Sequence, residues 1–509
     1  MFASGFKTTF NQKVSSRRVV VIGAGIGGLT VAALLARRGY QVRIFDQGFV
    51  AGGCASTFKR KGFVFDVGAT QVAGLESGGI HQQVFAELDM SLPPFEPIDP
   101  ACAVYLPDER KPIQVWRDPS RWHQERCEQF PGSETFWDLM ERLFRYSWQF
   151  QSRGPVLPPR NLWDLEQLIG AIRWETFLTL PYTFFTVGQL LKLQRIYQDR
   201  RLKTFLDLQL KLYSQVNADQ TAALYAATAL GITQAPQGLY RLQGSMQVLS
   251  DYLEKGLARY GGYLSTRHSV EHIYIEHGKA SGIKVRNQKT GQSWIEPADH
   301  VIANVTVQNL VHLLGSQCPQ GYKRRVEQLP EANGAFVVYL GVDRAAIPDN
   351  CPGHLQFLYD YGGPIGENNS LFVSVSHPND GRAPEGQATI VASTFTDVKP
   401  WWSCEDYVAM KQTYTEHAIA RLQQFFDLSP ENIIHIEAAT PRTFARFTAR
   451  DLGNVGGIGM RVNTFGPFGF SNRTPIPNLW LVGDSTHPGE GTAGVSYSAV
   501  TVVNQIVNN

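Results

Sequence analysis

Three glycines near the start of the chain follow the spacing Gly-x-Gly-x-x-Gly. They are Gly23, Gly25 and Gly28, which stand between the apolar run 19–22 and the Ala- and Leu-rich stretch 29–38. Such glycines permit a tight turn, close approach of the backbone to a pyrophosphate, and close packing of a helix on a strand. The start of the helix then offers free N–H groups and the positive end of its dipole to the phosphates. The motif predicts a dinucleotide site, with a purely structural glycine turn as the alternative.

An acidic residue stands at the position that such a site requires. Asp46 comes 18 residues after Gly28, at the end of a second predicted strand over 41–46. Its carboxylate can accept hydrogen bonds from both ribose hydroxyls and disfavours a 2′-phosphate, so NADP is not the expected ligand. This fingerprint alone does not distinguish NAD from FAD.

A second polar, glycine-rich stretch near the C-terminus bears on that distinction. The apolar run 479–482 leads into Gly483 and Asp484, and His487 and Glu490 lie in the loop that follows. Gly483 and Asp484 can offer a backbone N–H or a carboxylate to a ribityl chain or a pyrophosphate. A helix predicted from about 494 would direct its positive end at a flavin ring and stabilise the negative charge of the reduced form. An extended cofactor such as FAD can contact both ends of the chain.

The elements that would position these residues form an α/β pattern. Short apolar strands and helices alternate around the glycine motif, whereas 81–230 is helical in period and dense in Trp and Phe. That aromatic density suits either an ordinary core or the lining of an apolar tunnel. Further strands are predicted at 270–276, 283–287 and 299–304, strands of a second sheet at 335–342, 371–376 and 388–394, and helices at 246–258, 406–426 and 494–507.

Composition excludes several classes of protein. The 509 residues carry 47 Lys and Arg against 45 Asp and Glu, so the strong basic excess of a nucleic-acid binder is missing. A hydrophobic fraction of 43% is enough for a folded core. The six cysteines have no metal-binding spacing, and His268 and His272 lie on a predicted strand, so we expect free thiols and no metal site. The first 18 residues carry four basic residues and no apolar signal core, which predicts a disordered leader, with a weak targeting tail as the alternative.

Motifs spread over nearly the whole chain resemble one family. The glycine motif, Gly52-Gly53, the Phe-Asp-Val-Gly stretch at 65–68, Gly-Ser-Met at 244–246 and the terminal Gly-Asp-x-x-His-Pro-Gly are together similar to the FAD-dependent amine oxidase and phytoene desaturase superfamily. Within it the chain resembles the carotenoid desaturase and isomerase branch. The stretches 52–58, 65–71, 199–204 and 234–238 look most like the cyanobacterial C-3′,4′ carotenoid desaturases.

One position departs from that family pattern. Many relatives place Arg directly after the Gly-Gly pair, whereas this chain has Cys54. Any contact with the flavin or a phosphate that the Arg makes is therefore missing at this position. Lys59 and Arg60 are the candidates to replace it.

The resemblance implies a fold and further cofactor contacts. It implies an α/β fold in which a Rossmann-like FAD-binding domain of the glutathione-reductase type carries an inserted α+β substrate domain with a helical cap. Gly52, Gly53 and the backbone of Val270 would join the cofactor site, with Val270 at the adenine. The FAD-binding domain would comprise 1–80, 235–310 and 470–509, and the substrate domain 81–234 and 311–469.

The resemblance also implies a reaction. The leading hypothesis is an FAD-dependent carotenoid 3′,4′-desaturase, in which a hydride leaves an allylic carbon for the flavin and a proton leaves the adjacent carbon. His487 and Glu490 are candidates to accept that proton, with a loop-stabilising role as the alternative. Oxygen and a quinone are both candidate electron acceptors. The alternative functions are a carotenoid cis-trans isomerase that uses reduced flavin, an amine-oxidase-like flavoenzyme, and a flavin-free lipid carrier similar to the Rab GDP-dissociation inhibitors.

A carotenoid dissolves in lipid, so the mouth of its tunnel is expected to meet a membrane. The least polar run, 176–191, is shorter than the roughly 20 apolar residues that span a bilayer. We therefore expect a membrane-facing cap near 176–203 on a peripheral protein at the cytoplasmic side; the alternative is a cap helix packed on its neighbour. The segment 177–185 would dip into lipid, and the cations that could meet anionic head groups are Arg195, Arg200, Arg201 and Lys203.

Overall fold

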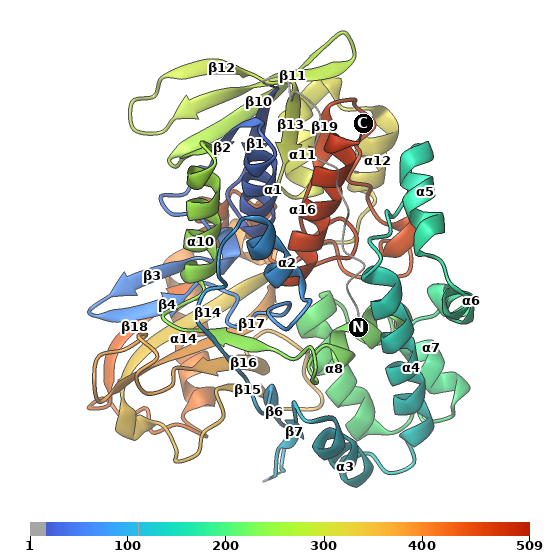
Figure 1. The fold of residues 1–509 in the computed structure, drawn as a ribbon. Helices are drawn as coiled ribbons and strands as arrows, with labels where there is room; N and C mark the ends of the chain where they lie inside the picture. Colours follow the sequence, from blue (N-terminus) through green and yellow to red (C-terminus); the bar gives the residue numbers. More distant parts are fainter. Residues whose placement is uncertain (1–16, 110, 509) are drawn as a thin grey trace.

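The computed structural model describes residues 17–109 and 111–508 (Figure 1). The predicted N-terminal leader falls outside this range, apart from its last two residues, of which Arg18 begins the first strand. Both ends of the described chain meet in one sheet, because the last strand pairs with a strand that pairs with the first.

Five parallel strands form this sheet, in the order β19-β13-β1-β2-β9. Alternate side chains of a strand point to opposite faces. Val19 and Val21 accordingly pack in one apolar cluster, and Val20 and Ile22 pack in another on the opposite face. The strands are β1 (Arg18–Ile22), β2 (Gln41–Phe45), β9 (Tyr263–Ser265), β13 (His300–Ala303) and β19 (Leu479–Leu481).

Helices and a small antiparallel sheet cover the two faces of the parallel sheet. On one face α1 packs against α10 and α16, and nearly all of its residues are buried, which explains why its sequence is rich in Ala and Leu. This face carries α1 (Ile26–Arg37), α2 (Ile80–Glu87), α10 (Gln247–Arg259) and α16 (Gly491–Val507). The other carries β10 (His268–Glu276), β11 (Lys279–Asn287), β12 (Ser293–Pro297), α11 (Val307–Leu314) and α12 (Gln320–Glu327).

A second sheet of seven strands has the order β18-β14-β17-β16-β15-β6-β7. Its pairs are antiparallel except for β15 with β6. One face packs on α14 (Tyr407–Leu422), and the other on the hairpin of β3 (Thr57–Arg60) and β4 (Phe63–Asp66). The strands are β6 (Cys102–Tyr105), β7 (Ile113–Val115), β14 (Asn333–Asp343), β15 (His354–Leu358), β16 (Ser370–Val375), β17 (Gln387–Asp397) and β18 (Ile433–Ala439).

A group of helices lies on the right of Figure 1. Its aromatic residues Trp122, Phe130, Trp137 and Phe205 pack on one another as a separate core and do not line the large cavity described below. For these residues the ordinary-core alternative is correct. The helices are α3 (Pro119–Gln129), α4 (Glu134–Gln151), α5 (Leu162–Ala171), α6 (Trp174–Thr179), α7 (Val187–Leu193), α8 (Arg200–Ser214) and α9 (Ala223–Gly231).

The mixed α/β class and each strand and helix predicted above are confirmed, with boundaries that differ by a few residues. Within the second sheet, β6, β7, β15 and β18 were not predicted, because the first three are short and the fourth is a half-exposed edge strand. The predicted domain boundaries stay a prediction. All six cysteines are free thiols, as expected. Within the described residues, no helix is both long and apolar enough to cross a bilayer.

Candidate functional site

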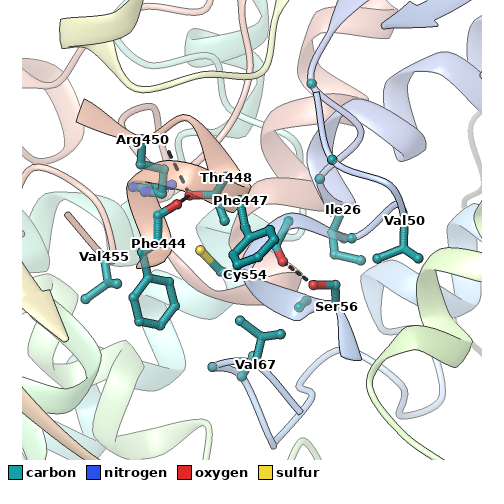
Figure 2. Close-up of a pocket in the computed structure, with 18 of the residues that line it drawn as sticks. Ile26, Val50, Cys54, Ser56, Val67, Phe444, Phe447, Thr448, Arg450 and Val455 are labelled. Carbon is teal, nitrogen blue, oxygen red and sulfur yellow. Dashed lines mark hydrogen bonds between the residues drawn. The ribbon is translucent and has the colours of Figure 1, made fainter. Parts of the chain in front are cut away.

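A cavity of about 1100 Å³ runs from the glycine motif to the second sheet. Gly23, Gly25 and Asp46 line one end of it, and Val337 and Tyr339 on β14 line the other. Figure 2 shows side chains of its wall, which come from both ends of the sequence. Such a cavity at the carboxyl ends of parallel strands is where an α/β fold binds its ligand.

The three predicted glycines form a cradle in which an added Cβ would crowd the backbone or the Asn304 side chain. A Cβ on Gly23 would lie 2.7 Å from the Asn304 carbonyl oxygen, and one on Gly28 would lie 2.1 Å from the Gly23 carbonyl oxygen. Gly25 precedes α1 without any side-chain cap, so the first N–H groups of the helix remain free for an anionic ligand. These observations fit the pyrophosphate of a dinucleotide.

Asp46 lies at the end of β2 and lines the same cavity. Its carboxylate accepts the N–H groups of Ala24 at 2.7 Å and Gly48 at 2.6 Å. Burial raises the pKa of this carboxyl, and the two N–H groups oppose that rise. Each carboxylate oxygen keeps a further lone pair that a ribose hydroxyl can use.

The other predicted contacts of the nucleotide also line the cavity. Gly52 donates its N–H to the Ala24 carbonyl at 2.8 Å, and both Gly52 and Gly53 have positive φ, which explains the glycine pair. Val270 lies on β10 and also borders the cavity. The structure therefore brings these residues together with the glycine cradle.

Asn304 is a site residue that the sequence reasoning missed. It follows β13, and its Nδ2 donates to the Gly23 carbonyl at 3.3 Å. The sequence did contain an indication of this role, because the predicted strand 299–304 ends at Asn304. The carboxyl ends of neighbouring parallel strands meet at the ligand.

Near the C-terminus of the chain, Gly483 and Asp484 follow β19 and line the cavity. Gly483 has a φ of +127° and donates its N–H to Ser498 Oγ at 3.2 Å. The Asp484 carboxylate pairs with Arg450 at 2.8 Å. Arg450 was also missed, because nothing near it in the sequence marks a site.

The two candidate proton acceptors are placed differently. Glu490 precedes α16 and lines the cavity, with Oε2 accepting Gln215 Nε2 at 2.9 Å and with Oε1 buried and unpaired among the described residues. Burial raises the pKa of Glu490 to about 8. His487 does not line the cavity, because Nε2 is bound to Gln151 Oε1 of α4 at 2.7 Å, and burial lowers the pKa of His487 to about 4.

Lys59 and Arg60 also border the cavity, and their role in place of an arginine at position 54 stays a prediction. Arg60 is exposed and pairs with Glu437 at 3.0 Å, and Lys59 is exposed on the same hairpin. The cation beside Cys54 is instead Arg450, which is close enough to oppose the rise that burial causes in the pKa of the thiol.

Comparisons with known proteins agree with this geometry. Residues 26–507 match the family of flavin containing amine oxidoreductases. Prolycopene isomerase 2 of an Oncidium hybrid cultivar is 27% identical over 96% of this chain and 83% of its own length. The zeta-carotene-forming phytoene desaturase of Myxococcus xanthus is 24% identical over 98% of this chain and 95% of its own. The structure of cyclohexylamine oxidase from Brevibacterium oxydans superposes with a TM-score of 0.63 at 13% identity, over 97% of this chain and 100% of that one. The chain therefore belongs to the flavin-containing amine oxidoreductases, and it is an FAD-dependent oxidoreductase.

Proposed function

We propose that this protein is an FAD-dependent carotenoid 3′,4′-desaturase, which removes two hydrogens from the end group of a long carotenoid. The observation that carries the proposal is the apolar wall of the cavity on the side of the second sheet. A hydrocarbon chain offers almost no polar groups, so its binding free energy must come from burial against such a wall. The wall includes Val64, Val67, Leu212, Val337, Phe395 and Val455.

The hydroxyl groups on this wall are already bonded within the protein. Tyr339 donates its hydroxyl to the Val67 carbonyl at 2.7 Å, and Ser393 donates to the Phe372 carbonyl at 3.3 Å. An ammonium or amine substrate needs polar partners when it is buried. The hydroxyl protons of Tyr339 and Ser393 are therefore used within the protein, and the apolar residues beside them suit the hydrocarbon of a carotenoid.

Two relatives that span almost the whole chain are named for reactions of polyenes, which supports a carotenoid as the substrate class. One is named an isomerase and the other a desaturase. This is why a carotenoid cis-trans isomerase that uses reduced flavin is the second candidate function.

The residues of the cavity have different roles in this proposal. The glycine cradle, Asp46 and Asn304 would hold FAD. When bound, FAD would supply the acceptor for the hydride and its two electrons. The apolar wall orients the polyene and excludes water. Glu490 is the candidate to take up the proton, because its carboxyl lines the cavity; since burial raises its pKa to about 8, it would do so in the ionised form that predominates above that pH.

We also propose that the protein attaches peripherally to a membrane through α5–α7. Of the twenty large apolar residues that are exposed in the described chain, nine lie between Leu162 and Leu193. These helices form one edge of the molecule in Figure 1. An exposed apolar patch of this density is typical of an interaction surface. The nine are Leu162, Leu165, Ile169, Trp174, Phe177, Leu178, Leu180, Phe184 and Leu193.

Of the four cations predicted to meet head groups, Arg195 and Arg200 are exposed, and Arg201 and Lys203 are paired within the protein. Arg201 pairs with Glu109, and Lys203 pairs with Asp207 and Asp219, so neither is free for a lipid head group. Arg200 lies over the Tyr361 ring. The exposed cations beside the patch are Arg173, Lys192 and Arg195. Attachment at the cytoplasmic side stays a prediction.

The predicted division into an FAD-binding part and a substrate part is likewise proposed. All five strands of the parallel sheet fall within 1–80, 235–310 and 470–509, and all seven strands of the second sheet fall within 81–234 and 311–469. The cavity borders both sets, as a site that joins a cofactor to a substrate must.

The test is anaerobic incubation of the FAD-loaded protein with acyclic and monocyclic carotenoids in liposomes, with product mass and flavin bleaching recorded together. A product lighter by two hydrogens, with one flavin bleached per product, supports the desaturase. An unchanged mass with a changed double-bond geometry supports the isomerase. Bleaching by soluble amines and not by any carotenoid would overturn both. Reoxidation by oxygen or by a quinone then identifies the electron acceptor.

Membrane attachment needs a separate measurement. The variant Trp174→Ser/Phe177→Ser/Phe184→Ser should lose most of its sedimentation with anionic liposomes while it keeps its bound FAD. Equal sedimentation of the variant and the parent would contradict the assignment of the patch.

A further inference from the structure

Arg450 is held in the wall of the cavity by groups on both sides of it. It follows α15 (Pro441–Thr448), and the backbone around it is bound by Asn309 of α11. Asn309 Nδ2 donates to the Ala449 carbonyl at 2.9 Å, and the Asp451 N–H donates to Asn309 Oδ1 at 3.1 Å. The position of Arg450 is therefore fixed by the protein itself.

The guanidinium of Arg450 keeps a donor for a ligand. Its Nε donates to the Asn454 carbonyl at 2.9 Å, and its Nη2 donates to the Gly456 carbonyl and to Asp484 Oδ2. No described residue accepts a hydrogen bond from Nη1, and Nη1 is not among the fully buried atoms that lack a partner. Since Arg450 lines the cavity, this nitrogen is accessible from it.

The guanidinium of Arg450 lies beside Cys54, the position at which this chain has no arginine after the Gly-Gly pair. Helix α15 packs against the turn Gly53–Ala55, which carries Cys54, and Figure 2 shows Cys54 and Arg450 in the same wall. Burial raises the pKa of the Cys54 thiol, so this side chain is neutral and supplies no charge of its own. The neighbouring Gly53 is close to Gly25, with an added Cβ 3.6 Å from the Gly25 Cα, so the turn that carries Cys54 lies beside the start of α1.

We propose that Arg450 binds the pyrophosphate of FAD and supplies beside the Gly-Gly turn the positive charge that Cys54 does not. A guanidinium forms short, charge-assisted hydrogen bonds to phosphate oxygens, and the free N–H groups of α1 face the same ligand. Asp484 would act as a positioning residue, because its carboxylate holds Nη2 and would repel a phosphate if Arg450 did not neutralise it. The proposal concerns the cofactor and does not depend on the carotenoid chemistry.

The first test is a fluorescence titration of apoprotein with FAD. Arg450→Met should weaken FAD binding about 10- to 100-fold, as expected for the loss of a hydrogen bond to a charged group. ADP, which contains the pyrophosphate without the flavin, should lose a similar factor, whereas adenosine should lose none. The matched control is Arg442→Met, an exposed arginine of α15 that lies over the Tyr407 ring, and it should bind FAD as the parent does.

A second set of variants tests whether Arg450 binds the pyrophosphate or only neutralises the charge of Asp484. Cys54→Arg in the Arg450→Met background should restore most of the FAD affinity, and Arg450→Lys should give an intermediate loss. If Arg450→Met/Asp484→Asn binds FAD as the parent does, Arg450 serves only to neutralise Asp484 and the proposal is wrong. Loss of affinity for FAD but not for ADP would place the guanidinium at the flavin instead and also overturn it. Thermal unfolding of each apoprotein verifies that it is folded.

Discussion

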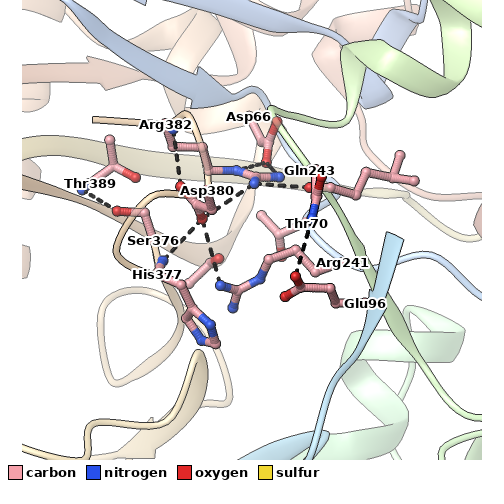
Figure 3. Close-up of polar contacts among 12 residues, drawn as sticks. Asp66, Thr70, Glu96, Arg241, Gln243, Ser376, His377, Asp380, Arg382 and Thr389 are labelled. Atoms are coloured by element: carbon pink, nitrogen blue, oxygen red, sulfur yellow. Dashed lines mark hydrogen bonds and ion pairs between the residues drawn. The ribbon is translucent and has the colours of Figure 1, made fainter. Parts of the chain in front are cut away.

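The buried arginine–aspartate pair Arg382–Asp66 and the partly buried pair Arg450–Asp484 differ in what their remaining polar atoms face. Arg382 donates Nε and Nη2 to Asp66 at 3.1 and 3.0 Å and Nη1 to the Leu242 carbonyl at 3.1 Å (Figure 3). The other oxygen of Asp66 accepts the N–H of Met246, directly before α10, at 2.8 Å. These side chains are 7% and 3% exposed, and neither lines the cavity.

The pair at the cavity, Arg450–Asp484, has fewer of its polar atoms hydrogen-bonded within the protein. Arg450 and Asp484 are 18% and 15% exposed, they share one hydrogen bond at 2.8 Å, and Arg450 Nη1 has no acceptor among the described residues. A buried pair whose atoms are all bonded within the protein fixes the arrangement of its elements, whereas one that keeps a donor at a cavity can hold a ligand. The comparison predicts that the first pair governs stability and the second governs affinity for FAD.

The largest expected effect is on stability. Arg382→Ala should lower the free energy of unfolding by about 3–5 kcal/mol, because it leaves the Asp66 carboxylate buried without its cation. Urea unfolding of the apoprotein measures this. Arg43→Ala is the control, since Arg43 is 59% exposed in its pair with Glu296, and it should change the free energy by no more than about 1 kcal/mol. Similar losses in the two variants would remove the distinction between buried and exposed pairs.

The next effect is on affinity. Asp46→Ala should weaken FAD binding about 10- to 100-fold, because the ribose hydroxyls lose a charged acceptor. Asp66→Asn, the structural counterpart, should lower stability with little change in affinity for FAD. FAD retained after gel filtration and a fluorescence titration measure both. Unchanged FAD content in Asp46→Ala would show that its carboxylate does not bind the ribose.

A third effect depends on pH. Burial raises the pKa of Glu490 from its ordinary value of 4.5 to about 8, so the folded state binds one more proton than the unfolded state between these two pH values. Its contribution to stability is complete below about pH 4.5 and is lost as the pH rises towards 8, by at most about 1.4 kcal/mol per pH unit. The stability of Glu490→Gln apoprotein relative to the parent should therefore rise from pH 5 to pH 8. A difference independent of pH would mean that Glu490 titrates normally.

The smallest expected effect is the stability of the cavity pair when both members are removed. Arg450→Met/Asp484→Asn should change the free energy of unfolding of the apoprotein by no more than about 1 kcal/mol, because no unpaired charge is left. The same urea experiment measures it. A loss as large as that of Arg382→Ala would make this pair structural too.

The sequence predicted those parts of the site that local patterns encode. Gly23, Gly25 and Gly28 belong to one strand–turn–helix unit, so their spacing and the neighbouring residues suffice. Arg450 and Asn304 reach the cradle through contacts between elements far apart in the chain, and no local pattern specifies which arginine lies beside Cys54.

The same reason explains two other differences. The His487 side chain is hydrogen-bonded to Gln151 of α4 and does not line the cavity. The sequence did not indicate where α4 lies. Asp66 belongs to a family motif, but its role depends on Arg382, which lies 316 residues later in the chain.

The most direct test of the account is a crystal structure of the FAD complex. The account predicts the ribose at Asp46 and the pyrophosphate at the start of α1, with a phosphate oxygen within about 3 Å of Arg450 Nη1. It also predicts that Arg382 and Asp66 keep their contacts unchanged. A pyrophosphate with no contact to Arg450, or FAD bound outside this cavity, would contradict it.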